Sequence, residues 1–179
     1  MTAAIEAGSP PALPLWRRAA LAALRVTVEH GEASQQIMRA PCIVTCNHLS
    51  LLDGIIIALA APRPLVFPVT TKFSRDHPVA PAVLRWFERR GLGTVVPMDG
   101  DYFYPLRSLY RALQAGHSVC IFPEGRIADS GPLPENPGFQ WLHEKTGCAV
   151  VHARLTGADK SRYFAKRGTR HLPPIPLAL

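Results

Sequence analysis

Residues 42–61 read Cys-Ile-Val-Thr-Cys-Asn-His-Leu-Ser-Leu-Leu-Asp-Gly-Ile-Ile-Ile-Ala-Leu-Ala-Ala, and this stretch decides the fold class. Its first part, 42–46, is β-branched and bounded by a proline and an asparagine, which predicts a buried strand. Ser50-Leu-Leu-Asp53 then has the form of a capping box that opens the apolar run 54–61, and this predicts a helix. A strand followed directly by a helix is the repeating unit of an α/β sheet.

Strand and helix patterns continue to alternate on the C-terminal side of this stretch. Such alternation predicts an α/β layered domain, with a central, largely buried mixed sheet flanked by helices. A length of 179 residues suits one domain, so we expect a flexible N-terminus over 1–12 and a single domain over 13–179. The other expected strands are 65–71, 93–98, 118–122, 148–155 and a short last one at 176–179, and the other expected helices are 13–28, 81–90, 105–115 and 139–146.

The charge balance restricts the partners. The chain has 20 Lys and Arg against 13 Asp and Glu, a formal charge of +7, which favours nucleic acid, acidic lipid or phosphorylated small molecules. Nucleic acid is disfavoured, because the basic residues lack the interleaved aromatic side chains of a stacking platform and no recognition motif is present. Basic residues concentrate at 160–170, where a solvated charge run and contact with an anionic surface are both open.

The segment 13–28 is expected to form a basic amphipathic helix. Leu15, Ala19, Ala22 and Val26 share one helical stripe. Packing on the core with a solvated arginine face is favoured over a membrane-interface position, although such helices serve either use. No signal peptide is expected over 1–11, and the longest apolar run, 54–62, is about half of the ~20 residues that cross a bilayer. Any membrane contact is therefore expected to be peripheral.

The cysteines predict reduced thiols rather than disulfides or a metal site. The chain has four cysteines, Cys42, Cys46, Cys120 and Cys148, and three of them lie in or beside apolar strand-like runs. Cysteine in such runs behaves as a small hydrophobe, and reduced thiols favour a cytosolic compartment over a secreted one. Cys42 and Cys46 with His48 lack a second ligand pair at metal spacing, so no metal is expected.

A loop after the first buried strand carries candidate catalytic residues. His48 follows the strand, and Asp53 lies five residues on at the start of a helix. If the loop folds back, Asp53 can accept a hydrogen bond from one ring nitrogen and leave the other nitrogen as a general base. The alternative, that Asp53 only caps the helix and His48 is a polar turn residue, stays open on spacing alone.

A second loop, Phe-Pro-Glu-Gly-Arg at 122–126, also follows an apolar strand. Gly125 permits close backbone approach, Arg126 offers a fork suited to phosphate, and Glu124 could orient the arginine or a substrate hydroxyl. An ordinary turn with a surface Glu-Arg pair is the alternative. Together the two loops predict a site that deprotonates a hydroxyl on an anionic substrate. Dinucleotide, P-loop and G-x-S-x-G fingerprints are absent.

These motifs resemble those of the glycerolipid acyltransferases that acylate lysophospholipids. The resemblance rests on Asn47-His48-x4-Asp53, the 122–126 block about 70 residues later, and Val-Val-His-Ala-Arg-Leu-Thr-Gly at 150–157, and it runs from about residue 21 to 157. Within the family, the branch acting on 2-acylglycerophosphoethanolamine is the most similar.

The resemblance implies a mechanism and its participants. His48 would deprotonate a glycerol hydroxyl that attacks an acyl thioester, with Asp53 holding the imidazole. Glu124, Gly125 and Arg126 would bind the acceptor's phosphate. Acyl-CoA or acyl carrier protein would supply the acyl chain as co-substrate, without a further cofactor or metal. The enzyme would work in the cytoplasm at the inner face of the cell membrane. Further site residues are expected at Asn47, Ser50 and Lys72.

Two departures from the family pattern bear on specificity. Members that use a phosphomonoester often carry a second arginine where this chain reads Val-Val-Pro-Met-Asp at 95–99. Since a phosphodiester needs fewer cationic partners, a lysophosphatidylethanolamine-like acceptor is favoured over lysophosphatidic acid. His152 replaces a proline and is interpreted as structural. The alternative function is a non-catalytic anionic-lipid or phosphate-binding module with the same fold.

Overall fold

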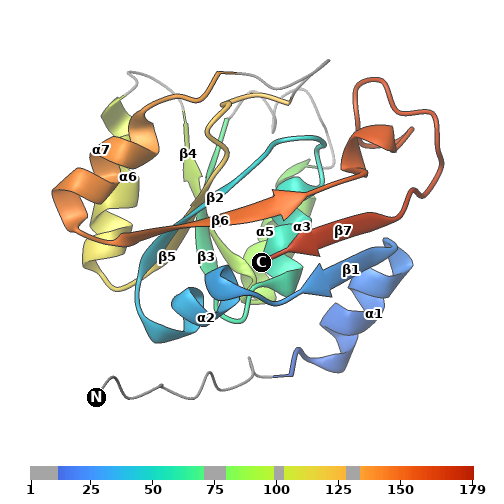
Figure 1. Cartoon of the computed structure of the whole chain (residues 1–179), viewed down its shortest axis with the longest axis horizontal. Coiled ribbons are helices and arrows are strands. Elements are labelled where there is room, and N and C mark those ends of the chain that lie inside the picture. Colours follow the sequence, from blue (N-terminus) through green and yellow to red (C-terminus); the bar gives the residue numbers. More distant parts are fainter. Residues whose placement is uncertain (1–11, 71–79, 99–102, 128–133) are drawn as a thin grey trace, which may run out of the picture.

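The computed structural model describes residues 12–70, 80–98, 103–127 and 134–179. In these residues a mixed seven-stranded sheet has the order β1-β7-β6-β2-β5-β3-β4 (Figure 1). Neighbouring strands among β2 to β6 pair in parallel, whereas β7 pairs antiparallel with β6 and parallel with β1. The strands are β1 (Val26–Glu29), β2 (Cys42–Cys46), β3 (Leu65–Val69), β4 (Gly93–Pro97), β5 (Ser118–Ile121), β6 (Ala149–Leu155) and β7 (Ile175–Ala178).

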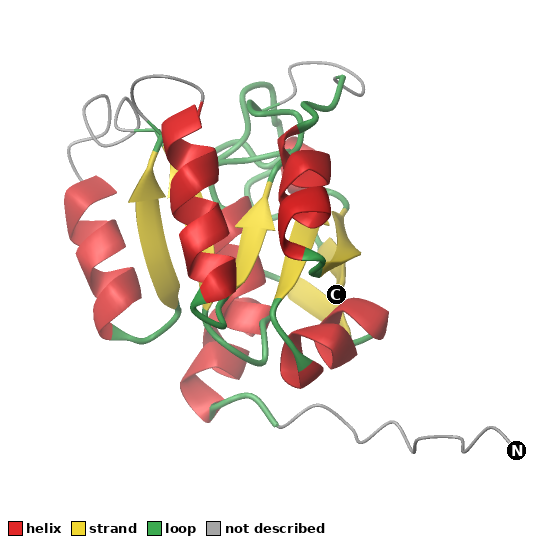
Figure 2. Cartoon of the chain, turned by 90° about the vertical axis from the view of Figure 1, so that its left-hand side faces the viewer, coloured by secondary structure: helices red, strands yellow, loops and turns green. Residues whose placement is uncertain are grey.

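Helices lie on both faces of this sheet (Figure 2). Leu109 and Leu113 of α6 and Leu142 of α7 pack on one face, where Ile43 and Val119 are buried. A second set of helices, including α3 and α5, packs on the other face. The helices are α1 (Leu15–Ala23), α2 (Glu32–Arg39), α3 (Asp53–Ala60), α5 (Ala80–Arg89), α6 (Phe103–Gln114) and α7 (Gly138–Thr146), with a 3-10 turn, η1, at Ala158–Lys160. The predicted α/β architecture with a mixed central sheet is confirmed.

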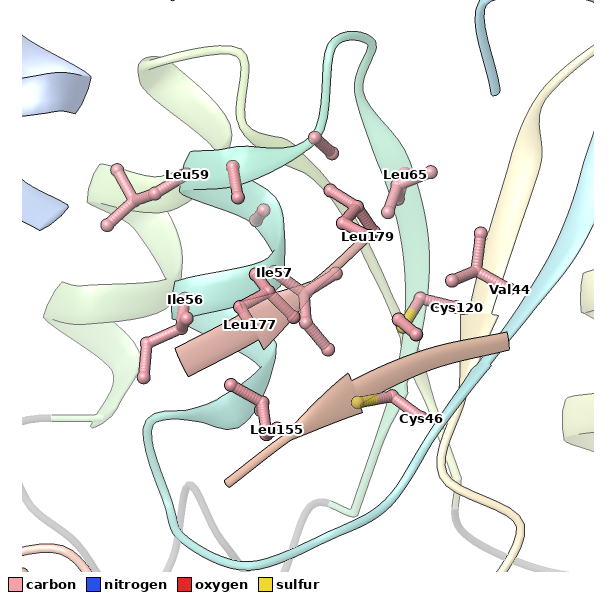
Figure 3. Close-up of a cluster of buried hydrophobic side chains, with 14 of the residues drawn as sticks. Val44, Cys46, Ile56, Ile57, Leu59, Leu65, Cys120, Leu155, Leu177 and Leu179 are labelled. Carbon is pink, nitrogen blue, oxygen red and sulfur yellow. The ribbon is translucent and has the colours of Figure 1, made fainter. Parts of the chain in front are cut away.

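The core surrounds the strand–loop–helix unit that the sequence singled out. Every residue of β2 is buried, as expected for a central parallel strand covered on both faces. Ile56 and Ile57 of α3 pack in the cluster that contains Val44 and Leu155 (Figure 3). Since β2 and α3 are both held by this core, the loop between them is fixed at the carboxyl edge of the sheet, where α/β folds place their ligand sites.

The N-terminal segment differs from its prediction. The helix expected over 13–28 ends at Ala23, because Arg25 takes a left-handed conformation with φ 56° and the chain then enters β1. The expected apolar stripe faces outward: Leu15 is 78% exposed, whereas Leu21 is buried. The larger apolar side chains provide the physical reason, since Trp16, Ala20 and Leu24 pack against the core, and Arg17 donates to the carbonyl of Ala61 at 3.2 Å.

Other expected elements occur with small shifts at their ends. Helix α2 is not among the expected elements, and it buries Ala33 and Ile37 against the core. The expected flexible N-terminus lies outside the described residues except for Ala12. Within the described residues, no helix is both long enough and apolar enough to cross a membrane.

Candidate active site

The carboxylate of Asp53 organises the loop between β2 and α3. The residue is fully buried at the first position of α3, where the helix dipole favours a negative charge. Its Oδ2 accepts hydrogen bonds from His48 Nδ1 at 3.0 Å, from the backbone N–H of Leu49 at 2.5 Å and from the backbone N–H of Ser50 at 2.7 Å. Its Oδ1 accepts a bond from Ser50 Oγ at 2.6 Å. The loop is therefore folded back on the carboxylate, as predicted.

The imidazole of His48 is oriented by two neighbours. An ionised carboxylate can only accept, so Nδ1 carries the proton when the ring is neutral. The ring also stacks on Phe122, with centroids 4.3 Å apart and planes inclined by 22°. Among the described residues, Nε2 has no hydrogen-bond partner, and the side chain is 21% exposed. Nε2 is thus an accessible base with a fixed direction.

Asn47 and Ser50 hold this loop in place. The Asn47 amide donates to the carbonyl of Leu155 at 2.9 Å and accepts from the N–H of the same residue at 2.8 Å. These two hydrogen bonds connect the end of β2 to the end of β6. Ser50 is buried and bonds only within the loop. Both expected site residues are therefore present at the site as residues that position His48 and Asp53.

The second predicted loop reaches the same place through Phe122. Gly125 has φ 67°, and its N–H donates to the carbonyl of Phe122 at 2.9 Å. Asn136, which was not anticipated, donates to the carbonyl of Pro123 from its backbone N–H at 2.8 Å and from its side chain at 3.0 Å. We call these two hydrogen bonds the Asn136 clamp. Asn136 precedes a proline in a Gly- and Pro-rich stretch, which is consistent with a loop-stabilising role, but its partner lies 13 residues away and no local pattern points to it.

Glu124 and Arg126 are not a pair. Within the described residues the only ion pair is that of His48 with Asp53. Glu124 Oε2 is buried, and the described residues provide it with no hydrogen-bond partner. Arg126 is exposed. No hydrogen bond or ion pair joins Glu124 to Arg126 within the described residues, so the expected orientation of Arg126 by Glu124 is not seen, and the enclosed Glu124 Oε2 has no partner.

Two cavities open beside the His48–Phe122 stack and share Pro123. One, the polar groove, has a volume of about 790 Å³ and includes Asn47, Leu49 and Glu124 in its lining. The other, the apolar pocket, has a volume of about 230 Å³ and includes Phe122, Leu106 and Met98. The loop whose Phe122 stacks on His48 thus borders both the polar groove and the apolar pocket. Such a pair of cavities suits a reactant with a charged end and a hydrocarbon end.

Comparison with known proteins agrees with this geometry. The family model described as Acyltransferase matches residues 25–159. The chain belongs to the acyltransferase family. Its fold is similar to the crystal structure of the 1-acyl-sn-glycerophosphate (LPA) acyltransferase PlsC from Thermotoga maritima, with a TM-score of 0.60 and 22% sequence identity. That similarity covers 90% of this chain and 68% of the PlsC chain.

Two buried thiols lie near Asp53. Burial, and to a lesser extent the charge of Asp53, raises the pKa of Cys46. Burial also raises the pKa of Cys120, and the charges of Cys46 and Asp53 raise it further by smaller amounts. These thiols stay protonated near neutral pH and are poor nucleophiles. In the part of the chain that the structure describes, no group of three or more His, Cys, Asp or Glu side chains could hold a metal.

Two further predicted residues differ in what the structure shows of them. His152 lies on β6, and its Nδ1 is 2.6 Å from Oγ1 of Thr45 on the neighbouring strand β2. The His152 side chain also lines the polar groove. This contact agrees with the structural interpretation of His152. Lys72 lies outside the described residues.

Proposed function

We propose that this acyltransferase transfers an acyl chain from an acyl thioester to the free glycerol hydroxyl of a lysophospholipid. The observation that carries the proposal is the His48–Asp53 pair: a buried carboxylate bonds Nδ1 and leaves Nε2 without a partner within the described residues, beside the Phe122 ring and the Pro123 that borders both cavities. Membership of the family supports acyl transfer. The choice of a lysophospholipid as acceptor and of a thioester as donor rests on the resemblance of the motifs.

The proposed reaction needs one proton shuttle. Nε2 of His48 removes the hydroxyl proton as the glycerol oxygen attacks the thioester carbonyl, forming a tetrahedral intermediate. The imidazolium, stabilised by ionised Asp53, returns the proton to the sulfur as the C–S bond breaks. The products are the diacyl phospholipid and the free thiol of CoA or acyl carrier protein. No acyl-enzyme forms, in agreement with the protonated state of the nearby Cys46.

The two cavities suggest where the substrates bind. The apolar pocket suits part of an acyl chain, because its lining consists mainly of aliphatic and aromatic side chains. In the loop after β5, exposed Arg126 is the proposed phosphate ligand. Gly125 contributes shape, since its N–H already bonds Phe122, and Glu124 is better suited to accept from a hydroxyl or amine than to bind phosphate. Lys72 remains proposed from sequence alone.

A membrane-surface position is proposed from exposed side chains on and beside α1 and α5. Leu15 is 78% exposed and Trp86 is 39% exposed. The guanidinium of Arg90 lies over the rings of both Trp16 and Trp86, at 5.3 Å and 5.8 Å from their centroids. Exposed tryptophan and leucine beside arginine suit an anionic bilayer interface. Flotation with anionic liposomes at low salt tests this, and a protein that stays at the bottom of the gradient would contradict it.

Thiol release tests the reaction. Purified protein is given acyl-CoA or acyl carrier protein thioesters with a panel of lysophospholipids, alongside His48→Ala and the control His117→Ala, an exposed histidine in the turn before β5. We expect acceptor-dependent release that His48→Ala lowers by at least 10³-fold and His117→Ala leaves unchanged. A folded wild-type protein silent with every pair would overturn the proposal and favour the non-catalytic lipid-binding alternative.

A further inference from the structure

The wall of the polar groove opposite the His48 loop is formed by one closed segment, which we call the C-terminal loop (residues 157–171). It lies between β6 and β7 and is the orange-to-red excursion beyond the tip of β6 (Figure 1). Leu51 of the His48 loop donates its N–H to the carbonyl of Phe164 at 2.9 Å. The loop is therefore attached directly to the segment that carries His48 and Asp53.

The C-terminal loop is held in one conformation by its own backbone. The N–H of Arg162 donates to the carbonyl of Arg170 at 2.7 Å, and the N–H of Arg170 donates to that of Lys160 at 2.9 Å. At Gly168 a Cβ atom would lie 1.9 Å from the carbonyl oxygen of Ser161, so only glycine allows this approach. The side chains of the loop are thus presented to the groove by a closed backbone.

Two cations of this loop, Lys160 and Arg167, line the groove, and within the described residues neither has a carboxylate partner. Lys160 and Arg167 both line it and are exposed. Neither forms an ion pair or a side-chain hydrogen bond within the described residues, where His48–Asp53 is the only ion pair. The same lining also contains the carboxylates of Glu124, Glu135 and Asp159. The groove therefore presents charges of both signs that are not neutralised by each other.

We propose that Lys160 and Arg167 bind the phosphate of a zwitterionic phosphodiester head group on the acceptor, and that Glu124 accepts a hydrogen bond from the amine of that head group. This rests on the proposed function and names the part of the chain that recognises its substrate. The cations replace the second arginine that residues 95–99 lack. Glu124 lines the same groove, and its carboxylate has no hydrogen-bond partner within the described residues, so this side chain provides the acceptor that an ammonium group needs.

Coenzyme A also carries phosphates and could compete for these cations. Its several phosphate charges suit the four cations of the groove lining, Arg154, Lys160, Lys166 and Arg167, but it lacks the alkylammonium group that the carboxylates of the same lining would bind. A lysophosphatidylethanolamine head group carries one charge of each sign and fits both sets. The test therefore includes an arm for each ligand.

Kinetics and binding are measured with Lys160→Ala/Arg167→Ala and with a control, Arg162→Ala. Arg162 is an exposed cation of the same loop that does not line the groove. In mixed micelles we expect the double variant to raise KM for lysophosphatidylethanolamine at least tenfold, with kcat within threefold and KM for acyl-CoA unchanged. Equal KM values for wild type and double variant, an equal rise in the control, or a rise confined to acyl-CoA would overturn the assignment.

A second readout does not depend on turnover. Phosphorus NMR line widths of glycerophosphoethanolamine, which has no acyl chain, are followed as each protein is added. Broadening by wild type and the control but not by the double variant supports the site, whereas no broadening by wild type overturns it. If thiol release fails while this binding is seen, the proposed reaction is wrong and the head-group site stands.

Discussion

Replacing Asp53 by Asn and by Ala separates its chemical role from its structural one. The carboxylate accepts bonds from three N–H groups at Oδ2 and from the Ser50 hydroxyl at Oδ1. In Asp53→Asn the amide oxygen can keep the three N–H bonds, and the Ser50 hydroxyl can rotate to accept from the new NH2 group. The geometry is expected to survive, but the negative charge beside the imidazole is lost.

The two variants differ in predicted stability. Weakening charged hydrogen bonds to neutral ones costs about 1–2 kcal/mol in Asp53→Asn. Asp53→Ala also leaves the backbone N–H groups of Leu49 and Ser50 without acceptors, at about 1–3 kcal/mol for each buried donor. We therefore expect a loss of about 3–5 kcal/mol in the free energy of unfolding for the alanine variant, which is roughly 10 °C in Tm for a protein of this size.

The predicted loss of activity, by contrast, is nearly the same for both. A neutral partner cannot stabilise the imidazolium that forms during proton transfer, so kcat for thiol release falls about 10³- to 10⁴-fold in either variant. The assays are thiol release with the best acceptor of the panel and urea denaturation of the same preparations. Asp53→Asn with kcat within tenfold of wild type, or equal stability of the two variants, would refute this account of the pair.

Three further predictions concern the surroundings of the pair. Asn47→Ala removes both bonds to Leu155 and should lower the free energy of unfolding by about 1–3 kcal/mol in urea denaturation, with a fall in kcat that Asn47→Asp does not restore, because a carboxylate cannot donate. Asn136→Ala should speed proteolysis within the loop after β5 while leaving the overall Tm within about 3 °C; unchanged proteolysis would contradict the clamp. Cys46 and Cys120 should resist labelling by iodoacetamide at pH 8 in the folded protein, and rapid labelling would contradict this. Because burial raises the pKa of both thiols above their unfolded values, the unfolded state loses protons first, and the free energy of unfolding should fall as pH rises above about 8.5.

Much of the architecture was predictable because strands and helices reflect local patterns. The β-branched run of β2 and the apolar run of α3 predicted both elements almost to the residue. The prediction failed where a distant contact decided the outcome. Trp16 and Ala20 of α1 pack against a core built by distant segments, and Arg17 reaches the carbonyl of Ala61, 44 residues away, so the Leu15 side of α1 faces outward. Strand β1 likewise depends on β7, whose partner residues lie near the other end of the chain.

The sequence by itself placed His48 and Asp53 in one short loop between a strand and a helix and so predicted their pair, while the spacing left a purely capping role for Asp53 open. The structure decided for the pair. It also determined the second loop as a candidate, since both loops follow strands of one parallel sheet. Only the tertiary structure decided that Phe122 stacks on His48 and that Glu124 keeps an unpartnered oxygen. Only the tertiary structure brought the C-terminal loop to the groove, because that contact joins Leu51 to Phe164 across more than one hundred residues and leaves no local pattern in the chain.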